Sequence, residues 1–125
     1  MNRYEIERNM KNARDAISKV FQKDGSGPVD KMMRSKISAF GAMVLMSGVV
    51  PALCYYRDNE EKIVDLVAAM YDNREPGIAN NFVKVITDRM DQQGQRETLT
   101  ENIINDSVSL KLAFNLFDLQ DMKKK

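Results

Sequence analysis

Apolar residues recur every three or four positions along almost the whole of this chain. In the first segment they are Ile6, Met10, Ala13, Ile17 and Val20, which this spacing places on one face of a helix. No segment reads as a strand, because the short β-branched runs lie inside helical patterns. With 125 residues, the chain has the size of one domain. We therefore predict an all-α fold, a compact bundle of about six helices in a single domain over residues 1–125.

Groups of turn-forming residues divide the chain into these helices. The Ser47–Gly48 step ends one helix and starts another, with Gly48 at the position where helices favour a left-handed residue. Thr98 and Glu101 have the spacing of a capping box at the start of the last helix. The predicted helices run from about Asn2 to Gln22, Pro28 to Gly48, Val50 to Arg57, a cap at Asp58 or Asn59 through Met70, Ile78 to Met90, and Thr98 to Leu119.

The longest apolar stretch, residues 39–56, is interrupted by Ser47, Gly48 and Pro51. Membrane-spanning helices need about 20 apolar residues, and the interruption favours a helix end inside the core of a soluble protein. Residues 1–8 are charged where a signal peptide has an apolar core. The expected location is the cytoplasm, without membrane contact.

Most catalytic chemistries lack their residues in this chain. There is no histidine, which removes histidine-based triads, metal ligands and proton shuttles. The one cysteine, Cys54, lies in an apolar segment and is interpreted as an inert core thiol. Gly25 and Gly27 form no phosphate-binding loop, because a third glycine and a preceding strand are missing.

Carboxylates at helical spacing leave one enzyme hypothesis, a Mg²⁺ site that acts on a nucleotide. Asp58, Glu61 and Asp65 have this spacing, as do Asp88 and Asp91. The first group coincides with a helix start, where the helix dipole stabilises acids, and the second flanks a loop. We therefore expect no catalytic residue, metal, cofactor or small-molecule substrate.

Charge is unevenly distributed, although the net charge is only +1. Residues 1–40 carry nine Lys/Arg and five Asp/Glu, whereas residues 41–107 carry six and eleven. A basic N-terminal part and an acidic middle favour two different partners, or head-to-tail contacts between copies. The imbalance is equally compatible with ordinary solvated helix faces, because dedicated nucleic-acid-binding domains are far more basic.

A basic helix, Arg34 to Met46, leads through the step Ser47-Gly48-Val49 into a short apolar helix, Pro51 to Tyr56, which Arg57 follows. This arrangement resembles the small-subunit family of the type III-B CRISPR effector, the Cmr complex. The basic, alanine-containing first helix and the apolar closing helix, residues 109–119, are also similar to that family. The resemblance follows the helix order along most of the chain and is specific over residues 34–57.

The resemblance implies a non-catalytic helical subunit in an antiviral RNA-guided complex. Several copies would stack beside the backbone subunits that carry the guide RNA, and would line the groove for the target RNA. Their contacts would go to backbone phosphates, so that binding would tolerate any sequence. Two departures are Phe40-Gly41, where the family often has a proline, and the short chain. They leave the small subunit of the related type III-A (Csm) complex as an alternative.

Basic residues on the first two helices, and the one after the apolar helix, are the candidates for phosphate contacts. They are Arg8, Lys11, Arg14, Lys19, Lys31, Arg34, Lys36 and Arg57. Arg57 is carried over from the resemblance, and Lys36 is the weakest because it lies beside the apolar stripe. Each is also compatible with an ordinary solvated side chain. Tyr55 or Tyr56 would be able to stack on a base, although burial in a central helix is the favoured interpretation.

A second hypothesis is a homo-oligomeric helical adaptor that binds only protein. It is motivated by the low net charge and by the small residues Ser35, Ser38 and Ala42 on one face of the second helix. Small side chains on a helix allow another helix to approach closely. Binding of RNA with a steep salt dependence distinguishes the first hypothesis from the second.

Overall fold

The computed structural model describes residues 2–22, 24–73 and 81–122, and the predicted all-α fold is confirmed. The helices are α1 (Arg3–Arg8), α2 (Met10–Phe21), α3 (Met32–Ser47), α4 (Val49–Asn59), α5 (Glu61–Asp72), α6 (Phe82–Met90) and α7 (Arg96–Ala113). A 3-10 turn, η2 (Phe114–Leu116), continues α7, and two short strands, β1 (Val29–Asp30) and β2 (Leu119–Gln120), pair with each other.

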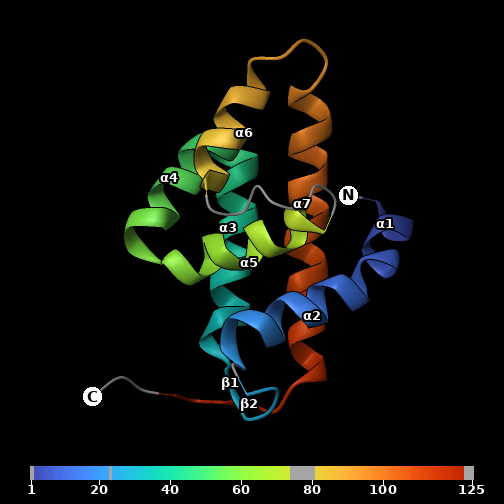
Figure 1. Ribbon diagram of the computed structural model, residues 1–125, viewed down its shortest axis with the longest axis vertical. Helices are drawn as coiled ribbons and strands as arrows, with labels where there is room; N and C mark the ends of the chain where they lie inside the picture. The colour runs from blue at the N-terminus through green and yellow to red at the C-terminus, as the bar shows by residue number, and fades with distance from the viewer. Residues whose placement is uncertain (1, 23, 74–80, 123–125) are drawn as a thin grey trace.

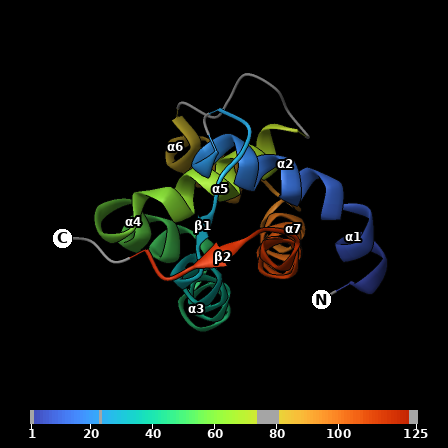
Figure 2. The same ribbon diagram turned by 90° about the horizontal axis from the view of Figure 1, so that it is seen from below.

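The two longest helices, α3 and α7, lie side by side along the long axis of the molecule and run in opposite directions (Figure 1). Helices α2 and α5 cross one side of this pair (Figure 2). Between the two layers lies the core, where residues such as Ile17, Phe40, Leu66, Ile103 and Phe114 are fully buried. The predicted apolar stripes therefore point inward.

A missing side chain brings α3 and α7 close together. A Cβ atom at Gly41 would lie only 2.8 Å from Ser107 Oγ on α7. Glycine is therefore the residue that fits this crossing without moving its neighbour. Ser107 is itself buried, and its hydroxyl donates a hydrogen bond of 2.8 Å to the carbonyl of Ile104.

The helix predicted from Pro28 begins instead at Met32, and the prediction that the chain holds no strand was wrong. The amide of Val29 donates to the carbonyl of Asp118, and the amide of Lys31 to the carbonyl of Gln120, both at 2.9 Å. These bonds form the parallel β1–β2 pair and draw the backbone before Met32 into an extended shape. The carboxylate of Asp30 then accepts from the amide of Met32 at 3.0 Å.

The single helix predicted from Asn2 to Gln22 is divided at Asn9 into α1 and α2. Two hydrogen bonds tie α1 to α7. The amide of Asn2 donates to Asn105 Oδ1 at 2.9 Å, and the buried Ser109 hydroxyl donates to the carbonyl of Ile6 at 3.2 Å. These contacts hold α1 at an angle to α2 (Figure 2). The sequence pattern carries no sign of them.

Three other predicted helix ends were wrong. The cap before α5 is Glu60, because α4 extends through Asp58 and Asn59. The last helix starts at Arg96, so that Thr98 lies inside α7 and caps nothing. Its regular part ends at Ala113 rather than near Leu119. The asparagine, proline and glycine of residues 73–77 also predict a turn between the helices that end near Met70 and start near Ile78, but residues 74–80 lie outside the described residues.

Gly48 separates α3 from α4, as predicted, with φ 98° and ψ 165°. The apolar stretch of residues 39–56 is thus shared between two helices that pack against each other. Among the described helices, none combines the length and the apolar character that crossing a membrane requires.

Candidate nucleic-acid interface

The eight candidate cations lie on three separate parts of the structure. Arg8, Lys11, Arg14 and Lys19 belong to α1 and α2, Lys31, Arg34 and Lys36 to the start of α3 and the residue before it, and Arg57 to the end of α4. In Figure 2, α1 and α4 lie on opposite sides of the α3–α7 pair. The chain by itself therefore does not gather the eight cations into one patch.

The outward face of α2 carries three exposed cations. Lys11 and Lys19 are exposed on the side away from the buried Ile17, and Arg14 is exposed at the flank of this side. Arg14 Nη2 lies 3.6 Å from Asp15 Oδ1, whereas Lys11 and Lys19 form no ion pair with any described residue. Because a helix rises 1.5 Å per residue, the two lysines are about 12 Å apart along the axis. This face, called the α2 lysine face below, offers two uncommitted positive charges.

On α1, the guanidinium of Arg8 is already paired. Its Nη2 lies 3.4 Å from Glu5 Oε1, one turn earlier on the same helix. Both side chains meet water, and an exposed pair of this kind contributes about 0–1 kcal/mol. Arg8 therefore remains able to exchange this partner for a phosphate at small cost.

At the start of α3, two of the three cations have partners from distant parts of the chain. Lys36 Nζ lies 2.6 Å from Glu60 Oε1, and the two side chains are 30% and 32% exposed. Arg34 Nη1 donates to Asn115 Oδ1 at 2.6 Å, while Lys31 is exposed. Lys36, the weakest of the eight candidates on sequence grounds, is thus engaged in joining α3 to the α4–α5 junction.

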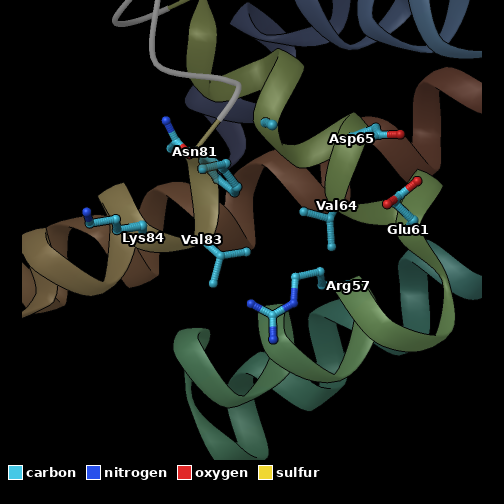
Figure 3. A pocket seen from close by; sticks show the side chains of 9 residues that line it. Arg57, Glu61, Val64, Asp65, Asn81, Val83 and Lys84 are labelled. Carbon is cyan, nitrogen blue, oxygen red and sulfur yellow. The ribbon is translucent and has the colours of Figure 1, made fainter.

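Arg57 lines a cleft of about 350 Å³ between the end of α4, one side of α5 and the start of α6 (Figure 3). Its walls carry two cations, Arg57 and Lys84, and two carboxylates, Glu61 and Asp65. Arg57 Nε also lies 3.3 Å from Asp58 Oδ1. Because the two carboxylates offset the two cations, this cleft attracts a phosphate less strongly than the α2 lysine face does.

The carboxyl group of Asp65 has a raised pKa. Partial loss of water around it is the largest cause, followed by repulsion from the Glu61 carboxylate, while Lys62 acts in the opposite direction. The folded protein therefore binds this proton more tightly than the unfolded chain does. Stability from this group is fully present below the unfolded pKa, near 3.9, and is lost as the pH rises through the raised folded value.

Replacing Asp65 by asparagine is therefore expected to raise the melting temperature at pH 7 and to leave it nearly unchanged at pH 3. The gain is within about 0.5 kcal/mol, because the carboxyl group is largely open to water. Thermal unfolding followed by circular dichroism at both pH values measures it. In a Glu61→Gln background the gain should shrink, and an equal gain at pH 3 and pH 7 would contradict the assignment.

The two tyrosines of α4 have different surroundings. Tyr56 is buried, with its ring edge-on to Phe40 at 5.3 Å between centroids. Burial, then Tyr55 and Glu60, raise the pKa of its hydroxyl. Tyr55 is 52% exposed. The burial favoured for both tyrosines is confirmed for Tyr56 and wrong for Tyr55, whose ring is accessible to a base.

Within the parts of the chain that the structure describes, no three His, Cys, Asp or Glu side chains come together as a metal site. Glu61 opens the first turn of α5, in agreement with a helix-start acid, but Asp58 lies inside α4. Asp88 lies in the last turn of α6, and Asp91 directly follows that helix. The carboxylates considered for a Mg²⁺ site thus fall on three helices, with Asp58 on α4, Glu61 and Asp65 on α5, and Asp88 and Asp91 at the end of α6.

A second apolar stripe on α7 was missed in the sequence. Ile104, Val108 and Leu112 line a groove of about 370 Å³ between α7 and α3. Their four-residue spacing was visible beside the buried stripe that contains Ile103 and Leu110. Two adjacent apolar stripes on one helix indicate a second packing surface.

No protein-family model, curated protein or solved structure matches this chain. The observations that bear on function are therefore the resemblance over residues 34–57 and the arrangement of the exposed side chains.

Proposed function

We propose that this chain is a non-catalytic small subunit of a cytoplasmic type III-B CRISPR effector, which acts in antiviral defence. Copies of it stack beside the backbone subunits that carry the guide RNA, and help to line the groove for the target RNA. The observation that carries the proposal is the resemblance over residues 34–57. Its three parts correspond to α3, the step at Gly48, and α4.

The α2 lysine face supports this role. Lys11 and Lys19 are exposed and unpaired among the described residues, and an ammonium group binds a phosphate oxygen without reading a base. Such contacts suit a subunit in which pairing with the guide supplies the sequence specificity. The distribution of the other cations over α3 and α4 fits a groove that several subunits complete together.

Reversing the charge of Lys11 and Lys19 together is expected to weaken binding of single-stranded RNA by the assembled complex. Each lysine lost from a phosphate lowers the slope of log affinity against log salt by about 0.7 for a single strand, so the double variant should lose about 1.4. The loss should be the same for RNAs of different sequence. Fluorescence anisotropy at four or more salt concentrations measures both quantities.

A matched control reverses Lys84 and Arg96, which makes the same change in net charge on α6 and α7. This variant should retain most of the affinity and the full salt slope at the α2 lysine face. An equal loss of RNA affinity in both double variants would mean that net charge alone explains the effect. An unchanged salt slope in Lys11→Glu/Lys19→Glu would show that α2 does not contact the RNA.

Purification of the tagged chain from its native host tests the assembly itself. We expect a multi-subunit complex that carries short, repeat-derived guide RNAs, identified by mass spectrometry and RNA sequencing. The same subunit list distinguishes a type III-B complex from the related type III-A complex. Recovery of the chain alone, without RNA, would overturn the proposal.

A homo-oligomeric adaptor that binds only protein is the second candidate function. It is favoured by one observation, the uncovered apolar groove between α3 and α7. Absence of RNA both from the isolated chain and from its native complexes would place this candidate first.

A further inference from the structure

The groove between α3 and α7 lies on the outer side of this helix pair. In Figure 2 no element that the structure describes covers the pair on the side away from α2 and α5. The groove has a volume of about 370 Å³ and predominantly apolar walls. One wall of the groove belongs to α3, where Gly41 and Ala42 have little or no side chain to fill it. The other wall is formed by Ile104 and Val108 of α7.

Two exposed leucines stand at the rim of this groove. Leu45 of α3 is 71% exposed and Leu112 of α7 is 44% exposed. Because α3 and α7 run in opposite directions, the two leucines lie toward opposite ends of the groove. The surface thus combines an apolar hollow with apolar projections, which is typical of an interaction site.

The outward face of α7 has a symmetric order of side chains. Glu101, Ile104, Val108 and Lys111 follow at intervals of three, four and three residues, which places them on one side of the helix. The acid and the base stand five residues before and after residue 106, and the two apolar residues stand two before and two after it. A two-fold rotation of the helix about this point therefore places Glu101 where Lys111 was, and Ile104 where Val108 was.

We propose that two copies of this chain associate through the α3–α7 face, around a two-fold axis at the level of residue 106. In this arrangement α7 lies antiparallel to the same helix of the second copy. Glu101 then faces Lys111 of the partner subunit, and the pair occurs twice because the contact is symmetric. Ile104 faces Val108 of the partner subunit between the two ion pairs.

A second copy fits this surface because the surface is complementary to itself. Each groove receives apolar side chains that project from an identical face, and each charged end meets its opposite. A two-fold contact of this kind closes after two subunits, in contrast to head-to-tail stacking. The inference does not rest on the proposed RNA-binding role, because Lys11 and Lys19 belong to α2, on the other side of the α3–α7 pair.

Sedimentation velocity from about 1 to about 200 µM protein, a range that covers ordinary micromolar affinities, tests the dimer. The wild-type chain is expected to pass from monomer to dimer over this range. Lys111→Glu and Glu101→Lys should each weaken the dimer by about 100-fold, because every symmetric contact then joins like charges. An equimolar mixture of the two variants should dimerise again, because each pair once more joins an acid and a base.

Lys84→Glu is the matched control, with the same change in charge on α6, and it should leave dimerisation unchanged. Circular dichroism and melting temperature establish that each variant is folded. A wild-type chain that stays monomeric over the whole range would overturn the proposal, as would a dimer that Lys111→Glu leaves intact or a mixture that fails to associate. A monomer that still binds RNA through α2 would contradict only the dimer, whereas a dimer without RNA binding would contradict only the proposed function.

Discussion

Replacing Phe40 by alanine is expected to lower the free energy of unfolding by about 3–5 kcal/mol. The Phe40 side chain is fully buried in α3, and its ring meets Tyr56 of α4 edge-on, with 5.3 Å between centroids and planes 88° apart. Alanine would remove the ring and leave a cavity between the two helices. Since domains of this size are stable by roughly 5–15 kcal/mol, the loss is a large part of the total. Denaturation by urea, followed by circular dichroism at low protein concentration, measures it.

Met46→Ala is the matched control for Phe40→Ala. Met46 lies on the same helix but is 87% exposed, so its truncation should change the stability by no more than about 0.5 kcal/mol. A similar loss in both variants would mean that α3 responds to any shortening of its side chains. A loss below about 1 kcal/mol for Phe40→Ala would contradict a tightly packed α3–α4 contact.

Replacing Gly48 by alanine is expected to cost about 1–3 kcal/mol. The backbone of Gly48, with φ 98° and ψ 165°, occupies a region that is almost restricted to glycine. A Cβ atom there would meet Pro51 Cδ at 3.7 Å, an ordinary contact, so the cost comes from backbone strain and not from a clash. The strain cannot relax easily, because α3 and α4 are packed on both sides of this residue. The urea midpoint, compared at constant slope, reports the change.

Gly27→Ala provides the comparison for Gly48→Ala. Gly27 also has a positive φ, 114°, but it lies in an exposed loop, where a Cβ atom would meet no described neighbour within 4 Å. The loop is free to adjust its backbone, so this substitution should cost clearly less. Equal losses at the two positions would show that the packing around Gly48 adds nothing to the strain.

Helix interiors were predictable from the sequence, whereas several helix ends were not. The stripes that contain Ile17, Phe40 and Ile103 point into the core because helical periodicity is a local property of the chain. The wrong ends are set by partners far away in sequence. Val29 takes its place in β1 through the carbonyl of Asp118, and no local pattern records a bond over such a separation.

The candidate interface shows the same division. Exposure of Lys11 and Lys19 follows from their place on the polar face of an amphipathic helix, which the sequence reveals. The engagement of Lys36 with Glu60, and of Arg34 with Asn115, depends on how separate helices meet. The groove between α3 and α7 requires both the glycine at position 41 and its neighbour on another helix, so neither segment predicts it alone.

The contacts of α7 also determine when the chain is able to fold during its synthesis. Helix α7 packs against α1, α2, α3 and α5, and β2 follows it to pair with β1. Until residues 96–120 have left the ribosome, the apolar faces of the earlier helices lack the surface that covers them. The nascent chain is therefore expected to remain accessible to chaperones and proteases until these residues emerge, and to close its core only then. A pause in translation before residue 96 would prolong this exposed state.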